Sequence, residues 1–386
     1  MSTIISPRAA SHGELVRLVR NRGGLSRRQL MAETGMSRAT LYSRLDTLAR
    51  LGLVYEAEAL DATGGRRARR IRFEDRGRVV LAVDLGQTHA RVAVADLFGT
   101  EQRRADLPIT VADRAEAVLG AVLDHAEKLV ASGSGERLVG VGFSVPSSVD
   151  PDSGLLRNAT ALPGGAAEAL VEAVSDRFDV PMVVENDARA GAVGESRSPD
   201  ETLIYLKIAT GIGCGIVVAG EALRGAGGLA GALGHVQVSA PGRGPAPRCG
   251  CRRLGCLAAY SSGRALVTRL GRPRIGSVAA LVAAAQQPEV QAVLAAGADV
   301  LGTALVPTVG ALNPHRVVLG GSLGRLPLVV DRVREQVRAA VPEQMWPVVE
   351  ASALGSRATP RGLARLVERH VFAPAAIDAL VARTGG

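Results

Sequence analysis

The chain has 386 residues, of which 47% are hydrophobic and only 3% aromatic, and its formal net charge is +9. This length predicts two or three domains, and their cores must be built mainly from Ala, Val and Leu. No segment has the ~20 continuous apolar residues of a membrane span, and the N-terminal residues lack the pattern of a secretory signal. We therefore expect a cytoplasmic protein with no membrane partner, in which thiols stay reduced.

The excess positive charge lies in the first fifth of the chain. Residues 1–78 contain sixteen arginines and eight acidic residues, whereas the remaining 308 residues carry a net charge of only +1. A basic segment before a neutral body favours binding to a polyanion such as a nucleic acid. A solubilising tail would have the same charge, but the apolar periodicity of this segment predicts a folded module.

Three helices are predicted in this basic segment. Apolar residues recur at helical spacing in residues 12–22, and a glycine pair ends that pattern. Residues 26–50 predict two further helices, with Ser26 and Ser37 as their N-caps and Gly35 in the turn between them. A helix, a glycine-bearing turn and a second helix form a DNA-binding arrangement, in which the second helix enters the major groove.

A β-hairpin wing is predicted next, because residues 53–73 contain two short strand-like segments around an arginine-rich Gly-Gly turn. Such a wing contacts the phosphate backbone or the minor groove. A small helical module that binds protein is the alternative, but the density of arginine favours a winged helix-turn-helix DNA-binding domain over residues 1–78. Arg38 and Arg44 are the candidates for base-specific contacts. The full set expected to contact DNA is Ser26, Arg27, Arg28, Ser37, Arg38, Thr40, Tyr42, Ser43, Arg44, Arg66, Arg67 and Arg69.

The body of the chain contains apolar strands that end in glycine turns. An Asp-x-Gly-x-Thr turn offers backbone and hydroxyl groups to a phosphate and a carboxylate to a hydrated Mg²⁺ ion, although many β-turns share its composition. A second glycine turn lies in the strand-turn-strand stretch LKIATGIGCGIVVAG at 206–220, and a third follows the apolar strand in RVVLGGSLG at 316–324. Three such turns predict two α/β lobes that face a cleft. The candidate phosphate-binding residues are Asp84, Gly86, Thr88, Gly211 and Gly213.

Two polar residues, Asn186 and Asp187, stand in VPMVVENDARAGAVGE at 180–195, where a strand ends and a helix follows. A carboxylate at the end of a strand that faces a cleft is placed to act as a general base toward a hydroxyl group. The simpler interpretation is an Asn-Asp helix cap.

Three of the four cysteines, Cys249, Cys251 and Cys256, lie in one Gly- and Pro-rich loop after His235. They form a disulfide staple or redox pair, remain a reduced thiol cluster, or hold a metal together with the histidine. Cys214 lies in a glycine turn and is expected to be a small buried residue.

Seven stretches in this order resemble the ROK family (repressors, open reading frames, kinases), and the resemblance extends over the whole chain. It implies an α/β fold, in which a winged helix-turn-helix precedes an actin-like or hexokinase-like (ribonuclease H-like) body. The lobes would be residues 79–195 and 196–386, with the last helix able to pack back on the first lobe. The stretches are VDLGQTH at 83–89, GFSVPSSVD at 142–150, VENDARA at 184–190, TGIGCGI at 210–216, LAGALGHVQV at 229–238, CGCRRLGCLAAY at 249–260 and VLGGSL at 318–323.

The resemblance also implies roles for individual residues. One imidazole and three thiolates form a tetrahedral structural zinc set, with the ligands His235, Cys249, Cys251 and Cys256. The effector-binding residues would be Asn186, Asp187 and His235, and Asp187 would be the family's general base, retained here as a vestige.

The sequence departs from the family pattern at positions that contact ATP or sugar. Gln87 and His89 replace the Gly and Lys of the first phosphate turn, so ATP and Mg²⁺ use is not expected. Ala232 and Ala258 stand where sugar-binding members have glutamates that accept hydrogen bonds from sugar hydroxyls. Ser147 replaces a glycine common in the family. The site therefore keeps the zinc ligands and Asp187 but loses part of its sugar-binding groups.

Together these observations predict a cytoplasmic DNA-binding regulator, a repressor, that binds a double-stranded operator as a homodimer or homotetramer. Its body would bind a small-molecule effector, a sugar or another compound, in the cleft without being an enzyme. An alternative is a bifunctional ATP-dependent sugar kinase that also binds DNA, and another is a protein-interaction scaffold with no DNA role.

Overall fold

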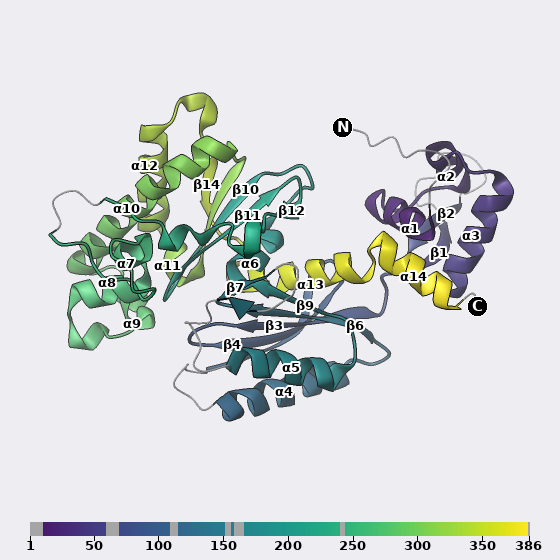
Figure 1. Cartoon of the computed structure of the whole chain (residues 1–386), viewed down its shortest axis with the longest axis horizontal. Coiled ribbons are helices and arrows are strands. Elements are labelled where there is room, and N and C mark those ends of the chain that lie inside the picture. Colours follow the sequence, from purple (N-terminus) through teal and green to yellow (C-terminus); the bar gives the residue numbers. More distant parts are fainter. Residues whose placement is uncertain are drawn as a thin grey trace. The chain divides into compact units, whose positions relative to one another are not determined.

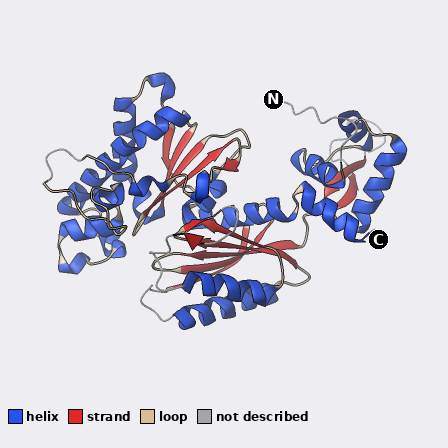
Figure 2. Cartoon of the chain, viewed as in Figure 1, coloured by secondary structure: helices blue, strands red, loops and turns tan. Residues whose placement is uncertain are grey.

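The computed structural model describes residues 11–58, 69–108, 115–150, 156–157, 166–239 and 244–384. The chain divides into two compact units, one formed by residues 1–78 with 367–386 and the other by residues 79–366 (Figure 1). Helices and strands occur in both units (Figure 2).

The described residues of the N-terminal segment of the first unit form three helices and a two-stranded antiparallel sheet. Ser26 caps the second helix in a capping box with Gln29, and Ser37 caps the third by accepting from the Thr40 N–H. Gly35 ends the second helix at a φ of 65°, which a glycine adopts without strain. The elements are α1 (His12–Asn21), α2 (Arg27–Thr34), α3 (Arg38–Arg50), β1 (Val54–Glu58) and β2 (Arg69–Phe73).

The C-terminal helix α14 (Pro374–Thr384) completes this unit by packing on α1. The two helices approach closely at Gly13, where an added Cβ would lie 2.1 Å from the Pro374 carbonyl oxygen. The Gly13 N–H donates to Asp378 Oδ1 at 2.9 Å, and Arg20 forms an ion pair with Glu368 at 2.5 Å. Two segments at opposite ends of the sequence thus form one folded unit.

The second unit contains two five-stranded sheets with the same strand order. Each sheet places its strands in the order third, second, first, fourth, fifth along the chain. In both, the first strand pairs antiparallel with the second, and the fourth pairs parallel with the fifth. This repeat is the two-lobed actin-like body. The first sheet has β3 (Arg78–Leu85), β4 (Ala90–Asp96), β5 (Glu101–Leu107), β6 (Arg137–Val145) and β9 (Met182–Asn186), and the second has β10 (Leu203–Ile208), β11 (Ile212–Val218), β12 (Glu221–Ala222), β13 (Arg316–Gly320) and β14 (Val348–Ala351).

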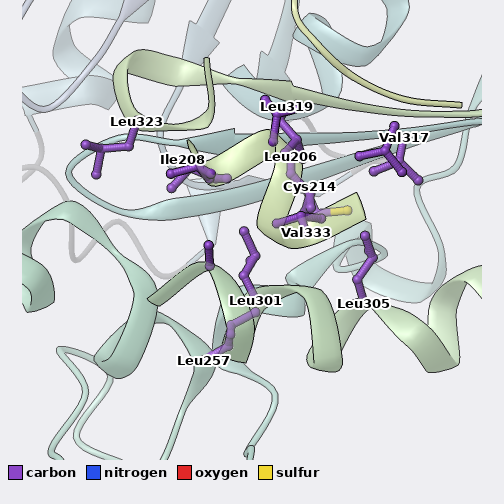
Figure 3. Close-up of a cluster of buried hydrophobic side chains, with 14 of the residues drawn as sticks. Leu206, Ile208, Cys214, Leu257, Leu301, Leu305, Val317, Leu319, Leu323 and Val333 are labelled. Atoms are coloured by element: carbon purple, nitrogen blue, oxygen red, sulfur yellow. The ribbon is translucent and has the colours of Figure 1, made fainter. Parts of the chain in front are cut away.

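Helices cover both faces of these sheets. On the first sheet, α4 (Ala115–Ala131) and α5 (Ala166–Phe178) bury Val122 and Val174 against the strands. On the second, α10 (Pro288–Leu312) and α12 (Pro327–Ala340) pack over β10 and β13, and Figure 3 shows Leu301 and Val333 facing Leu206 in this core. The other helices of this lobe are α7 (Leu257–Ser261), α8 (Gly263–Leu270), α9 (Val278–Ala283) and α11 (Gly321–Gly324).

Between the sheets lie α6 (Asp187–Glu195) and α13 (Ala358–Val371), whose apolar residues join one cluster with residues of both sheets. The core is built from small residues here, since Ala188, Ala190 and Ala192 are all fully buried. This packing fixes the N-terminus of α6, where Asp187 stands.

One helix, α10, is long and apolar enough to cross a membrane by length and composition alone. Its residues Val290, Leu294, Leu301 and Leu305 are buried in the core of the second lobe. Core packing therefore accounts for its apolar character.

Candidate functional site

The helix-turn-helix exposes polar and basic side chains on α3. Arg38, Thr40 and Ser43 are exposed, while Leu41, Leu45 and Leu48 form the buried face. The guanidinium groups of Arg27 and Arg38 lie 5.0 and 5.3 Å from the ring centroid of Tyr42. These cation–π contacts hold Arg38 along the outer face of α3.

The remaining predicted DNA-contacting residues have different environments. Arg27 forms an ion pair with Glu56, Arg28 is exposed, and Arg69 begins β2 with Glu56 3.8 Å away. Ser26 and Ser37 are both helix caps. Arg66 and Arg67 lie outside the described residues.

Arg44 lies in a groove on one side of α3 instead of on its outermost face. The groove has a volume of about 840 Å³ and is shared with the C-terminal helix α14. Burial and the positive charge of Arg44 lower the pKa of His12, which lines the same groove. Sequence patterns did not indicate that α14 lies beside α3. The lining residues are His12, Thr40, Ser43, Arg44, Thr47, Arg50, Leu51, Val381 and Thr384.

The four predicted zinc ligands meet at one place in the second unit. One ligand atom from each of His235, Cys249, Cys251 and Cys256 lies within 4.8 Å of the others. Cys256 is 1% exposed and follows the turn formed by residues 249–253, in which the Cys249 N–H donates to the Arg253 carbonyl at 2.8 Å. A short antiparallel bridge between Gln237 and Cys256 brings the histidine segment to the cysteine loop.

The distances in this cluster fit a tetrahedral metal. Cys251 Sγ lies 3.6 Å from Cys256 Sγ, and Cys249 Sγ lies 3.7 Å from His235 Nδ1. With Zn–S bonds of about 2.3 Å and Zn–N bonds of about 2.0 Å, a tetrahedron requires separations of roughly 3.5 to 3.8 Å. The backbone N–H of Arg253 lowers the pKa of Cys251, whereas burial raises that of Cys256 to about 12. All four cysteines are free of disulfides.

Asp187, the candidate general base, forms a buried ion pair with Lys207. Lys207 Nζ on β10 donates to Asp187 Oδ2 at 2.8 Å, and Asp187 Oδ1 accepts from the Ala188 N–H. Burial alone would lower the pKa of Lys207, but the carboxylates of Asp187 and Asp84 raise it above its usual value. The Lys207 ammonium thus donates to one of the two carboxylate oxygens of the candidate base.

Asp84 lies on the other side of this lysine. It is 2% exposed and accepts from Ser144 Oγ at 2.8 Å, with His89 and Arg91 nitrogens 3.7 Å away. Burial would raise the pKa of Asp84, yet Lys207, His89 and Ser144 hold it well below its usual range.

The two glycine turns lie next to each other, and side chains fill the space at the first. An added Cβ at Gly86 would be 2.3 Å from the His89 ring, so this ring covers the turn. Arg264 Nη2 donates to Gln87 Oε1 at 3.1 Å, and the Gln87 amide nitrogen is 3.7 Å from the Cβ position of Gly211. The two residues that depart from the family pattern therefore lie in the first turn, with Gln87 beside the second turn.

The remaining predicted site residues are divided between two places. Gly213 lies beside Asp187, since its Cβ position is 3.9 Å from Asp187 Oδ1, and Thr88 is exposed in the first turn. Asn186 caps α6, accepting from the Ala188 and Arg189 N–H groups, so the simpler capping interpretation holds for its side-chain oxygen. Among the described contacts, those of the His235 ring are with the cysteine loop and none joins it to Asp187.

Two lobes of identical strand order, with paired carboxylates and glycine turns between them, define an actin-like sugar-kinase type of body, here joined to a winged helix-turn-helix. A family model described as the ROK family matches residues 80–370. The chain belongs to the ROK family.

Two individual relatives of this chain are named as transcriptional regulators. The chain is 27% identical to the xylose repressor of Bacillus subtilis strain 168 over 360 residues, which cover 90% of this chain and 91% of the repressor. It is 30% identical over 266 residues to NagC, a DNA-binding transcriptional dual regulator of Escherichia coli K12, covering 66% of this chain and 63% of NagC.

Among the solved structures, a regulator of this family matches a larger part of this chain than a kinase does. A ROK-family transcriptional regulator, a homologue of the E. coli MLC protein, has the same fold over 96% of this chain and 98% of its own, with a TM-score of 0.75 and 22% identity. A ROK glucokinase from Streptomyces griseus, solved with glucose and AMPPNP, covers only 75% of this chain, with a TM-score of 0.63 and 26% identity. The chain is a transcriptional regulator of the ROK family.

Proposed function

We propose that this regulator represses transcription from a double-stranded operator, responds to a small molecule bound beside Asp187, and does not transfer phosphate. The proposed lack of phosphate transfer is supported by the ion pair between Lys207 and Asp187. A general base must accept a proton from the attacking hydroxyl, and here a lysine ammonium already donates to it. Gln87 and His89 add a second obstacle, because they fill the turn where a γ-phosphate would lie.

DNA binding is supported by the charge and shape of the first unit. Three of its arginines lie on α3 and three on β2, and most of the net positive charge of the chain lies in residues 1–78. Arg38 on the outer face of α3 suits a base contact, whereas Arg44 in the groove suits a phosphate. We propose that two or four copies bind together, because a symmetric operator requires paired recognition helices.

Zinc is the metal proposed for the cluster of His235 and the three cysteines. The ligand chemistry and the separations fit this ion, whose role with four protein ligands is structural. When bound, it would tie the turn Ala232–His235 to the cysteine loop and so shape one wall of the effector site. The proposal also places the protein in the cytoplasm, where the thiolates stay reduced.

Effector control requires that the ligand bind one arrangement of the protein more tightly than another. A sugar or sugar derivative is the effector class that the relatives suggest. Ala232 and Ala258 carry no carboxylate, and their elements pack together, so this part of the site offers fewer acceptors to sugar hydroxyls.

The test is to sequence the genomic fragments that the purified protein retains. We expect enrichment of one inverted-repeat site, and a loss of retention when Arg38 and Arg44 are both replaced by alanine. Retention of no specific fragment would contradict the proposal and favour a protein-interaction scaffold. The kinase alternative is tested separately by a coupled assay for ADP release over a sugar panel, in which turnover with any sugar would overturn the proposed lack of phosphate transfer.

A further inference from the structure

The groove between α3 and α14 is lined by positive charge and hydroxyl groups. Its nine lining residues comprise two arginines, one histidine, four residues with a hydroxyl group and two apolar residues. None of these lining residues is acidic. The groove therefore offers positive charge and hydrogen-bond donors to an anion, and its volume of about 840 Å³ leaves room for one.

The two arginines of the groove are not neutralised by the described part of the protein. Arg44 is half-buried, and Arg50 Nη2 donates to Thr47 Oγ1 at 3.2 Å. Among the described residues neither forms an ion pair with a carboxylate, whereas Arg20 and Arg27 of the same unit do. A guanidinium without a carboxylate partner can bind a phosphate through charge-assisted hydrogen bonds.

The position of the groove on α3 indicates the source of this phosphate. Thr40 and Ser43 line the groove and are also exposed on the helix that carries Arg38. Half or more of the hydrogen bonds between proteins and DNA go to the sugar-phosphate backbone. A duplex that meets the exposed face of α3 would therefore bring a backbone phosphate to the groove.

His12, the first residue of α1, is the member of this lining whose charge changes near neutral pH. Burial and the positive charge of Arg44 lower the pKa of His12 below its usual value of 6.5, although Asp378 on α14 acts in the opposite direction. In the free protein the imidazole is therefore mostly neutral at pH 7.

The other charged groups near the start of α1 already have partners or lie farther away. Asp378 Oδ1 accepts from the Gly13 N–H at 2.9 Å, and Glu14 forms an ion pair with Arg17. On β2, which also packs on α1, the Arg72 side chain lies beside Gly24, a residue that follows the opposite end of α1. Arg44 is thus the main charge that opposes protonation of the imidazole.

We propose that this groove binds a phosphate of the DNA backbone and that His12 takes up a proton when it does so, which strengthens DNA binding as the pH falls. This inference rests on the proposed DNA function and adds a regulation of the same surface. The negative phosphodiester offsets the repulsion from Arg44, so the pKa of His12 rises on binding. The resulting gain in affinity is complete below the pKa of the free protein and is lost as the pH rises through the pKa of the complex.

The test is the affinity of the full-length protein for a DNA duplex of about 30 base pairs with mixed sequence, because phosphate contacts do not depend on sequence. Fluorescence anisotropy measures the Kd at about pH 6 and about pH 8 with the ionic strength held constant. We expect binding to be roughly threefold to tenfold tighter per protomer at the lower pH. Equal affinity at the two pH values, or no binding at either, would overturn the inference.

Two variants show whether the proton is taken up at His12. In His12→Gln the ratio of the two affinities should fall below about twofold. His370→Gln, at an exposed histidine of the same unit, is the matched control and should keep the ratio of the wild type. A ratio that persists in His12→Gln would show that the proton binds elsewhere.

A permanent charge at the same position distinguishes a phosphate contact from a structural role. His12→Lys should bind the duplex at about pH 8 at least as tightly as the wild type does at about pH 6, and its affinity should not depend on pH in this range. Binding weaker than that of His12→Gln at the higher pH would contradict a phosphate beside this residue.

Folding of the variants is checked by thermal unfolding without DNA. If they do not fold, calorimetry of the wild type in two buffers of different ionisation enthalpy measures the protons taken up on binding. We expect uptake of a fraction of one proton per protomer near pH 7, and no uptake would overturn the inference. Loss of genomic DNA retention at every pH would reject the DNA function itself, whereas retention that does not vary with pH rejects only the role of His12.

Discussion

Lys207 Nζ lies 2.8 Å from Asp187 Oδ2, and its charge also acts on Asp84, so that one lysine compensates two buried carboxylates. Removing one partner of such a pair leaves buried charge uncompensated, whereas replacing all the partners by apolar groups is often tolerated. The contact therefore serves two purposes. It stabilises the centre of the body, and in the function proposed above it occupies an oxygen that phosphoryl transfer would need.

Replacing this lysine should destabilise the protein strongly near neutral pH. Lys207→Met is expected to lower the free energy of unfolding by about 3–5 kcal/mol, because Asp187 would be left without its cation and Asp84 would keep only the more distant Arg91 and His89. Urea unfolding at pH 7 measures the change. Lys128→Met, at the only other lysine and an exposed one, is the matched control and should change stability by less than about 0.5 kcal/mol.

The difference in unfolding free energy between the wild type and Lys207→Met should become smaller at acidic pH. The pKa of Asp84 is depressed in the folded protein, so its stabilising contribution exists above the ordinary value of 3.8 and is lost as pH falls through the folded pKa. The pKa of Lys207 is raised, so its contribution persists up to and beyond the ordinary value of 10.5. The gap between wild type and Lys207→Met should thus be largest from about pH 5 to 9 and smaller near pH 3. A gap independent of pH would argue against an electrostatic origin.

The cysteine loop should hold about one equivalent of zinc per chain. Cys256→Ser removes a buried ligand and should reduce the zinc content to near zero and lower the Tm, because the free energy of metal binding is lost from the folded state. Cys214→Ala is the control. Burial raises the pKa of Cys214 to about 12, and this thiol lies in β11 outside the cluster, so the metal content should not change. The zinc content of both variants is measured by mass spectrometry. A full equivalent of zinc in Cys256→Ser would show that the assigned ligands are wrong.

The N-cap of α3 allows stability and DNA binding to be separated. Ser37→Ala removes the acceptor for the Thr40 N–H and should cost about 1 kcal/mol of stability. Ser37→Asp keeps the cap and suits the helix dipole, so it should unfold like wild type. Its carboxylate would nevertheless stand among the residues proposed to meet phosphates, and DNA affinity should fall at least tenfold.

Equal DNA affinity of Ser37→Asp and wild type would show that the start of α3 lies away from the DNA. Because phosphate contacts release counterions, the salt dependence gives a second measure. Each lost contact should reduce the slope of log K against log salt by about 0.9.

Local sequence patterns predict the helix caps, but they do not predict contacts between residues that are far apart in the sequence. The caps Ser26 and Ser37 follow from residue type and spacing, and both are present. Lys207 was not recognised as part of the site, although a charged residue in the otherwise apolar strand LIYLKI was a usable signal for a buried partner. The partner itself, Asp187, depends on how two lobes meet, which no local period encodes. The packing of α14 on α1 had no sequence signal, because it joins residues more than 350 positions apart.

Backbone contact between α6 and α13 should make Gly362 intolerant of any side chain. An added Cβ there would lie 1.7 Å from the Ala190 carbonyl oxygen, and one at Gly194 would lie 2.0 Å from that of Ala358. The first oxygen cannot move without shifting α6 and the second cannot move without shifting α13, so Gly362→Ala should cost about 3 kcal/mol or more. Gly120→Ala, at an exposed position in α4 with no atom within 4 Å of the new Cβ, should instead stabilise the protein by about 0.5–1 kcal/mol. Thermal and urea unfolding of both variants measure the contrast, and a Gly362→Ala protein as stable as wild type would mean that α6 and α13 do not pack this closely.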